Sequence, residues 1–429
     1  MNENALMVAI ALALLAFGAI SRRAERGIVT PPMVFVLLGI GVGRWGLDWI
    51  DLPLENPLLD GLGELALILV LFTDASRIDL KSLRASASLP FRLLAIGLPL
   101  TFFLGAALAL GLFPEFGIWE ALVLAAILAP TDAALGQAVV SSPLVPVRIR
   151  QTLNVESGLN DGIALPVVLL AISLAGAMGG EASSWIRFGL LQVGLAPIVG
   201  ALVGYGGGQV VSRATHAEWM SPSFQHLSAL SLSVLAYAGA EMVGGNGFIA
   251  AFVCGLTLGN TARDICECVH DFGEAEGQLL TLLVFLLFGA VILPDVVTEL
   301  APRHLAYALL SLTLVRMIPV GLSLLGSGLM PASLGFIGWF GPRGLASILY
   351  MLIVVEEGHF EAGHQIEAVV ALTVLISTVA HGISAFPLAS RYGAYVARVD
   401  AETPDVASEH VPVHESRVRL TFSSHEEGD

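Results

Sequence analysis

The sequence predicts an all-α polytopic membrane protein. Of its 429 residues, 55% are hydrophobic and 13% are charged, whereas a soluble domain carries about 25% charged residues. Apolar blocks of about 18–25 residues, the length that a helix needs to cross the hydrocarbon core, recur along nearly the whole chain. A transmembrane barrel would instead require segments of about ten residues with alternating polarity. The formal net charge of −16 gives no reason to expect a nucleic acid partner.

About thirteen apolar blocks are expected to form membrane helices, with ends uncertain by a few residues. They cover residues 4–21, 28–43, 63–76, 91–112, 118–141, 153–174, 186–211, 225–243, 246–260, 275–293, 304–327, 333–355 and 366–389. The first block lacks the basic residues that precede a signal peptide, so we expect a retained helix. Residues 396–429 are polar and are expected to form a short disordered cytoplasmic tail.

The basic residues predict a protein of the cell (inner) membrane with its N-terminus outside and its C-terminus in the cytoplasm. On this topology most of the 20 Lys and Arg residues fall in the inside connections, as the positive-inside rule requires. The outside connections hold only Arg44, Arg187 and Arg303 and are otherwise acidic.

An odd number of spans fits two inverted six-helix repeats joined by the seventh span. The fifth span is interrupted at Pro130-Thr131, and the twelfth contains Gly-Trp-Phe-Gly-Pro-Arg-Gly at residues 338–344. Proline and glycine are common in membrane helices, but interruptions at corresponding places in two halves point to a midplane site formed by broken helices. Because each interruption lies beside a charge, Asp132 or Arg343, we expect spans 5 and 12 to cross at a functional site.

Polar residues of the fifth and sixth spans form the candidate site for a cation and a proton. Ser157, Asn160 and Asp161 share one helix face through i, i+3 and i+4 spacing. With Thr131 and Asp132 they supply carboxylate, hydroxyl and amide oxygens, and for Na⁺ itself the expected ligands are Asp161, Asp132, Thr131 and Ser157. Low dielectric favours the neutral carboxyl form, so Asp161 should take up a proton when the cation leaves. The alternative is that Asp161 is a hydrogen-bonded packing residue.

Two arginines inside spans are expected to have structural roles. Arg316 is the natural partner of Glu156, and this buried pair would hold Asn160 in place, because stranding one member of such a pair is costly. Arg343 is expected at the crossing, where it would offset the negative C-terminal ends of the half-helices and the charge on Asp132. Which arginine serves Glu156 stays open at this point.

These residues resemble a known family, the monovalent cation:proton antiporters of the NhaP/NHE type. The resemblance covers residues 1 to about 395. It rests on Asp132 in Ala-Pro-Thr-Asp, the Glu156-Ser157-x-x-Asn160-Asp161 motif, the span around Arg316, Pro342-Arg343-Gly344, and the stretch Phe-Thr-Asp-Ala-Ser-Arg-Ile-Asp-Leu at residues 72–80. Pro342 departs from many relatives, which leaves the local helix geometry open.

The resemblance implies a NhaA/NapA-like fold with a transmembrane antiporter domain at residues 1–395. A moving core around residues 91–174 and 275–389 would work against a dimerisation domain made by the remaining helices of a homodimer in membrane lipid. It also implies elevator-type exchange of Na⁺, and of Li⁺, for H⁺ in Na⁺ and pH homeostasis. Electroneutral exchange is implied because related electrogenic antiporters have Asp where this chain has Asn160. No cofactor and no enzyme activity are expected.

Three alternatives remain open from the residues. K⁺ could replace Na⁺, because residue identities do not determine the preferred ion. A cation channel would need a continuous polar pore, whereas the polar groups here cluster at one depth. Two intramembrane aspartates could form a protease dyad, but neither lies in the Gly-x-Gly-Asp setting of that class.

Cys266, Cys268 and His270 could hold a metal, although free thiols at a helix end are the simpler interpretation.

Overall fold

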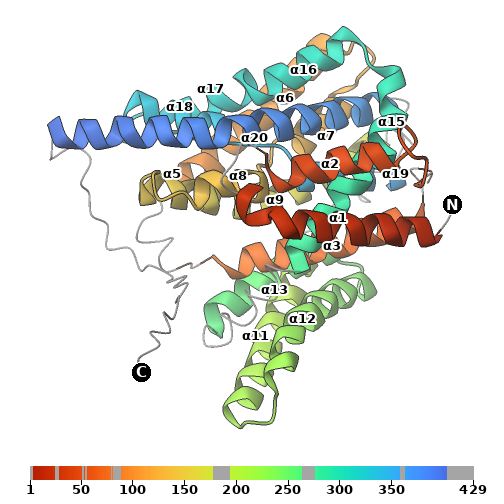
Figure 1. Cartoon of the computed structure of the whole chain (residues 1–429). Helices are drawn as coiled ribbons and strands as arrows, with labels where there is room; N and C mark the ends of the chain where they lie inside the picture. The colour runs from red at the N-terminus through yellow and green to blue at the C-terminus, as the bar shows by residue number, and fades with distance from the viewer. Residues whose placement is uncertain are drawn as a thin grey trace, which may run out of the picture.

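The computed structural model describes residues 3–24, 29–50, 53, 56–78, 80, 88–176, 194–262, 276–357 and 363–402. Within these residues the named elements are all helices, and an isolated bridge between Gly43 and Ile50 is the one strand-like pairing. Most helices run roughly along a common direction and form a single bundle (Figure 1). The all-α prediction is therefore confirmed.

The first half of the chain supplies the first six predicted spans. Its elements are α1 (Glu3–Ala24), α2 (Pro31–Val42), α3 (Pro57–Ser76), α5 (Ser88–Arg92), the π-helical η1 (Leu93–Gly97), α6 (Leu98–Leu112), α7 (Ile118–Ile127), α8 (Ala133–Val140) and α9 (Val147–Gly176). The elements α5, η1 and α6 are continuous and together make the fourth span.

The second half begins with α11 (Ala196–His216), α12 (Pro222–Met242) and α13 (Gly247–Thr261). A helix from residue 276 then passes through the π-helical η3 (Phe288–Ile292) into α15 (Leu293–Val296) and the 3₁₀ turn η4 (Val297–Glu299). The remaining elements are α16 (Pro302–Leu312), α17 (Leu314–Ser323), α18 (Pro331–Trp339), α19 (Leu345–Glu357) and α20 (Gly363–Glu402).

The described helices are consistent with the predicted spans. Those long and apolar enough to cross a membrane are Ser88–Leu112, Val147–Ile172, Glu276–Val296, Pro302–Ser323 and Gly363–Val399, and shorter apolar helices accompany them. Residues 177–193 and 263–275 lie outside the described residues, so the count of thirteen stays a prediction, as does the character of Cys266, Cys268 and His270.

The C-terminal boundary differs from the expected one. A disordered tail was expected to start at residue 396, but α20 continues as a helix to Glu402. Residues such as Tyr395 and Val396 pack against neighbouring apolar side chains and carry the helix past the last apolar block. Residues 403–429 of the expected tail lie outside the described residues.

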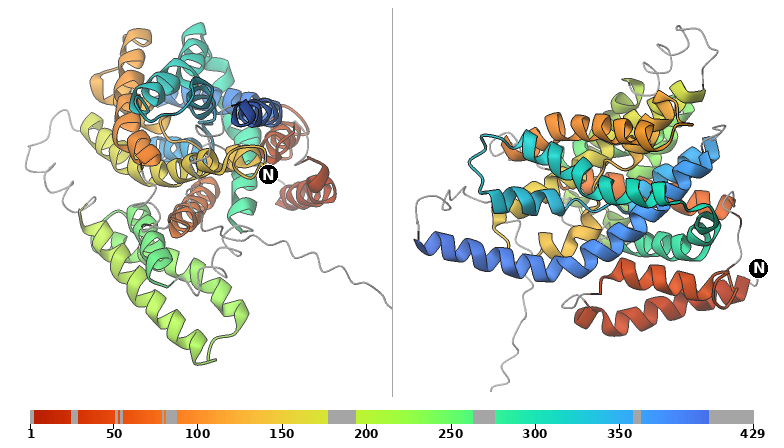
Figure 2. Two further views of the ribbon diagram at one scale, coloured as in Figure 1. Left: turned by 90° about the vertical axis from the view of Figure 1, so that its left-hand side faces the viewer. Right: turned by 90° about the horizontal axis from the view of Figure 1, so that it is seen from above.

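Both predicted interruptions are present. Helix α7 ends at Ile127 and α8 begins at Ala133, whereas α18 ends at Trp339 and α19 begins at Leu345. Seen along the bundle, the α11–α12 pair lies to one side of the other helices, and α1 and α2 lie together on another side (Figure 2). The broken helices therefore belong to the larger group of helices.

Helix α13 joins the α11–α12 pair to α3 by a close backbone contact. Its Gly255 and Gly259 form a G-x-x-x-G pattern, and a Cβ on them would lie 2.8 Å from the carbonyl carbons of Phe72 and Ser76, respectively. Small residues allow such close approach between helices in a membrane, where packing rather than the hydrophobic effect drives association.

We expect Gly255→Ala to lower the apparent melting temperature in detergent, because overpacking a tight contact costs roughly 1–3 kcal/mol. Gly206→Ala on α11 is the matched control, because a Cβ there would have nothing within 4 Å. The control should melt at or slightly above the wild-type temperature, since alanine is the better helix former. An equal loss in both variants would contradict the assigned contact.

Candidate functional site

The two interruptions meet at Asp132, which binds backbone groups on both sides of the crossing. Its N–H donates to the carbonyl of Pro342 at 2.8 Å. Its Oδ2 accepts from the N–H of Leu345 at 2.6 Å, and its Oδ1 accepts from the N–H of Leu135 at 3.3 Å. These N–H groups lie at the N-termini of α19 and α8, where a negative charge is stabilised. Asp132 therefore caps two half-helices at once, a role that the sequence analysis did not foresee.

The C-terminal ends of the other two half-helices are also bound by side chains. Ser347 donates from Oγ to the carbonyl of the last residue of α7 at 2.8 Å. Near the end of α18, Arg343 donates from Nη1 to the carbonyl of Gly341, and Nε2 of His381 donates to that of Trp339, both at 2.9 Å. Backbone polar groups at membrane depth have no water to bind, so these side chains make the crossing possible.

Arg343 thus lies at the crossing, as expected, and neutralises the C-terminal end of α18. It is fully buried. Its Nε and Nη2 have no hydrogen-bond partner in the described part of the chain, so these atoms make no hydrogen bond to Asp132. The N–H groups of Leu135 and Leu345 bind the aspartate, and the expected offset of its charge by Arg343 stays a prediction.

Arg316 and Glu156 form the expected buried ion pair. Nη1 and Nη2 of Arg316 lie 2.5 and 2.8 Å from Oε1 and Oε2 of Glu156, a bidentate geometry. A Cβ on Gly341 would collide with Nε of Arg316. The pair therefore connects α9 and α17 with the break between α18 and α19. The arginine that pairs with Glu156 is thus Arg316.

The hydroxyl and amide groups predicted for the site lie together. Oγ1 of Thr131 lies 2.9 Å from Oγ of Ser157 and accepts from Nδ2 of Asn160 at 2.7 Å. The next residue, Asp161, is buried, and its backbone carbonyl accepts from the hydroxyl of Tyr350 at 2.8 Å. Oδ1 of Asn160 and Oδ1 of Asp161 have no hydrogen-bond partner among the described residues.

Two other carboxyl groups lie near the buried Asp161. Asp74 on α3 and Asp132 at the crossing both repel an ionised Asp161, and Oγ1 of the neighbouring Thr73 is buried without a hydrogen-bond partner in the described chain. Like charges at low dielectric favour uptake of a proton or of a cation. Broken membrane helices commonly supply the oxygens that bind such ions, so the donor set fits a monovalent cation.

Several contributors were missed by the sequence analysis. Ser377 on α20 accepts from the N–H of Arg343 at 2.6 Å, and it shares a helix face with His381 through i, i+4 spacing. Tyr350 and Ser347 are likewise related by i, i+3 spacing on α19. Polar side chains at such spacings inside apolar spans are a signal of function, and this signal could have identified them. Asp74 was noted only as part of the family resemblance.

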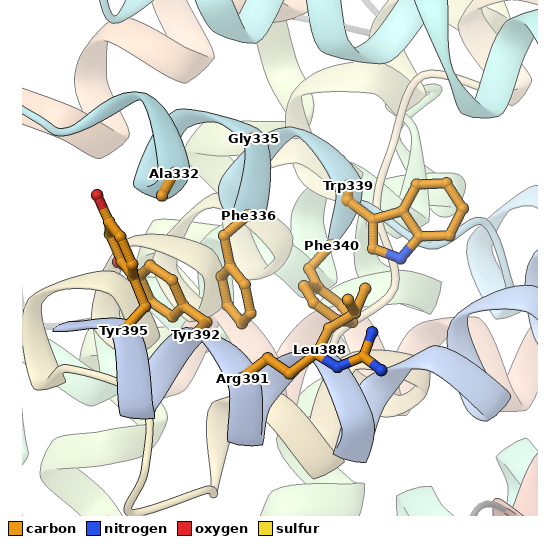
Figure 3. A pocket seen from close by; sticks show the side chains of 9 residues that line it. All are labelled: Ala332, Gly335, Phe336, Trp339, Phe340, Leu388, Arg391, Tyr392 and Tyr395. Atoms are coloured by element: carbon orange, nitrogen blue, oxygen red, sulfur yellow. The ribbon is translucent and has the colours of Figure 1, made fainter. Parts of the chain in front are cut away.

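The cavity in Figure 3 is not this site. It has a volume of about 300 Å³ and lies between α18 and α20, lined mainly by aromatic side chains such as Phe336, Trp339 and Tyr392. Arg391 is its charged residue, and none of the carboxylates discussed above lines it. The candidate site is therefore defined by buried polar atoms at the helix crossing rather than by an open pocket.

Comparison with known proteins agrees with this arrangement. Residues 10–391 match the family model described as "Sodium/hydrogen exchanger, transmembrane". The chain is 29% identical over 365 residues to the K(+)/H(+) antiporter NhaP of Alkalimonas amylolytica, covering 83% of this chain and 61% of that protein. It is 28% identical over 399 residues to the Na(+)/H(+) antiporter NhaP of Pseudomonas aeruginosa, covering 85% and 90%, respectively.

The fold is also similar to a solved structure. The sodium proton antiporter MjNhaP1 from Methanocaldococcus jannaschii at pH 8 matches with a TM-score of 0.73 and 19% identity, covering 89% of this chain and 100% of that one. The chain spans about three fifths of the length of the first relatives named as K(+)/H(+) antiporters. The likeness to the solved structure supports the predicted NhaA/NapA-like fold class.

We expect Glu156→Gln and Arg316→Ala each to lower stability by roughly 3–5 kcal/mol, because the remaining charge is stranded in the bundle. Melting in detergent measures the loss. Glu115→Gln is the control, because its partner Arg303 lies at the surface, where an ion pair contributes about 0–1 kcal/mol. Unchanged melting in both core variants would show that the pair does not hold the site together.

Proposed function

The chain belongs to the sodium/hydrogen exchanger family, and we propose that it exchanges a monovalent cation for a proton at a site centred on Asp161. The observation that carries this proposal is the buried carboxylate of Asp161, with an unpartnered Oδ1 and like-charged neighbours Asp74 and Asp132. Either a proton or a cation can neutralise Asp161, but each excludes the other. That competition produces exchange if the protein reorients only with the site filled.

The oxygens available for the cation come from three elements. Asp161 and Ser157 lie on α9, Thr131 lies at the break after α7, and Asp74 lies near the end of α3. Thr131 is linked by hydrogen bonds to Ser157 and Asn160, so α9 and the broken helix would adjust together around the ion. Asp132 contributes negative charge while it caps α8 and α19.

Na⁺ is the proposed cation, with Li⁺ as a second substrate. Exchange is proposed to be electroneutral, because Asn160 orients Thr131 without adding a charge and one exchanging carboxylate carries one proton or one cation. Relatives are named for K⁺ as well as for Na⁺, so K⁺/H⁺ exchange is the alternative that the experiment below must separate.

An elevator-type motion is proposed, in which the core around residues 91–174 and 275–389 moves as a unit. The Glu156–Arg316 pair and the caps at the crossing support this proposal, because they tie the core helices to one another. The remaining helices, including α3 and α11 to α13, would form the fixed domain. Large apolar side chains such as Leu202, Tyr205 and Leu235 are exposed on α11 and α12, which suits a dimer face or lipid.

The proposed orientation has the N-terminus outside and the C-terminus in the cytoplasm of the cell membrane. Arg92 at the start of the fourth span donates to the carbonyl of Leu325 after α17, and Leu144 before α9 packs on Gly393 of α20. These contacts gather the Arg-rich ends of the spans on one side, which the positive-inside rule assigns to the cytoplasm. We call the opposite end of the bundle, where α3 begins, the outer end.

Proteoliposomes with a pH-sensitive dye in an acid-loaded lumen test the proposed function. Adding Na⁺ or Li⁺ outside should raise the internal pH, and a potassium–valinomycin clamp should leave this rise unchanged if exchange is electroneutral. A response to K⁺ alone would keep the mechanism and change the substrate. Current under voltage clamp that accompanies the cation flux would instead indicate a channel.

In the same assay Asp161→Ala and Asp132→Ala should abolish exchange, because the first removes the exchanging carboxylate and the second removes a charge and the caps at the crossing. Asp295→Asn is the control, since Asp295 pairs with Arg44 away from the crossing, and its exchange rate should match that of the wild type. Wild-type exchange in Asp161→Ala would exclude the proposed site.

A further inference from the structure

Phe252 of α13, in the proposed fixed domain, lies against α9 of the proposed moving core, beside the candidate site. A Cβ on Gly162 would lie 2.5 Å from Cδ2 and 2.6 Å from Cζ of the Phe252 ring, so the ring rests directly on the Gly162 backbone. Gly162 immediately follows Asp161. The ring is buried, and it packs on the residue that follows the proposed exchanging carboxylate.

The boundary is packed differently one helical turn away. At Gly158, on the same face of α9, a Cβ would meet only the carbonyl oxygen and Cβ of Asp74, at 3.8 and 3.9 Å. These are ordinary van der Waals distances. Toward the outer end, in contrast, α19 closes on α3, because a Cβ on Gly63 would lie 3.1 and 3.3 Å from Leu349 and Leu352. Apolar side chains therefore make the contacts at Gly162 and, further toward the outer end, at Gly63, whereas the polar Asp74 makes the contact at Gly158, one turn nearer the inner end.

We propose that Phe252 is the outer gate of the exchange site: its ring, seated on Gly162, blocks the path from Asp161 to the outer end, and it must leave Gly162 for the site to face outward. The inference rests on the proposed exchange and adds a positioning residue to it. Phe252 contacts neither the cation nor the proton. It acts by excluding water from one side of the carboxylate, which prevents proton leakage while the site faces inward.

The Gly162–Phe252 contact suits a gate because one partner has no side chain and the other is a single rotatable ring. Moving the ring requires no rearrangement of the α13 backbone, which is held on α3 through Gly255 and Gly259. A Cβ at position 162 would displace the ring rather than the helix. Gly162→Ala and Phe252→Ala should therefore have the same effect, an opened outer path.

Cysteine accessibility tests the gate without depending on transport. Cys254, Cys266 and Cys268 are the native cysteines; with these replaced, Asp161→Cys in the full chain is labelled in proteoliposomes by a membrane-impermeant thiol reagent. With Phe252 present, labelling from the outer side should be slow relative to the inner side. Adding Phe252→Ala or Gly162→Ala should speed outer-side labelling by about tenfold or more, which corresponds to a barrier lowered by about 1.4 kcal/mol.

Two variants separate a gate from a merely structural contact. Gly158→Ala is the matched control, since its added Cβ finds ordinary contacts, and its labelling should match the background. Phe252→Leu keeps an apolar plug, so it should restore most of the protection. If Phe252→Ala does not fold, Gly162→Ala and Phe252→Leu still report on the same barrier.

Proton leak provides the second readout, in proteins that keep Asp161. Acid-loaded proteoliposomes in choline, without a transported cation, should lose their pH gradient faster with Phe252→Ala or Gly162→Ala than with wild type or Gly158→Ala. Outer-side labelling and leak that are unchanged by both variants would overturn the gate. Absence of wild-type exchange with every cation would overturn the proposed function instead, and the labelling result would still decide whether Phe252 closes the outer path.

Discussion

Two helices are broken in the middle of this bundle, and each break exposes backbone groups that lipid cannot satisfy. Asp132 answers this constraint at the N-terminal ends, because its two oxygens accept N–H groups from α8 and α19. At the C-terminal ends, the exposed carbonyl groups accept hydrogen bonds from Ser347, Arg343 and His381. The crossing therefore depends on specific polar side chains from α19, α20 and the breaks themselves, which converge there.

The same constraint explains why so many charges lie inside the bundle. The Glu156–Arg316 pair contributes no net charge, yet it connects α9 and α17 with the backbone at Gly341. Arg343 supplies a positive charge where helix α18 ends. Once these groups are accounted for, Asp161 stands out, because its Oδ1 has no hydrogen-bond partner in the described chain and its carboxylate neighbours repel it. This is the carboxylate that we propose a proton or a cation neutralises.

The interface between the proposed core and the remaining helices borders the candidate site. Asp161 lies on α9, which packs against α3 and α13, and this is the surface along which the proposed core would move against the remaining helices. Glycines at this surface allow close approach, whereas Phe252 and the leucines of α19 fill its outer part. In the proposed gate, the ring of Phe252 would leave Gly162 without disturbing the packing of α13 on α3.

Apolar block length, Gly/Pro interruptions and intramembrane charges were enough to predict the helical class and both breaks, because each follows from local composition and from the cost of charge in lipid. They also indicated a buried arginine partner for Glu156, but only the structure decided that this partner is Arg316. Helical spacing likewise placed Ser157, Asn160 and Asp161 on one face. Only the tertiary structure revealed that Asp132 caps two helices and that the ring of Phe252 packs on Gly162. It also revealed the hydrogen bonds made by Ser347, Ser377, Tyr350 and His381. These contacts depend on which residues of distant helices lie at the same depth in the bundle. Helix packing determines that alignment, and the local periodicity of the sequence does not encode it.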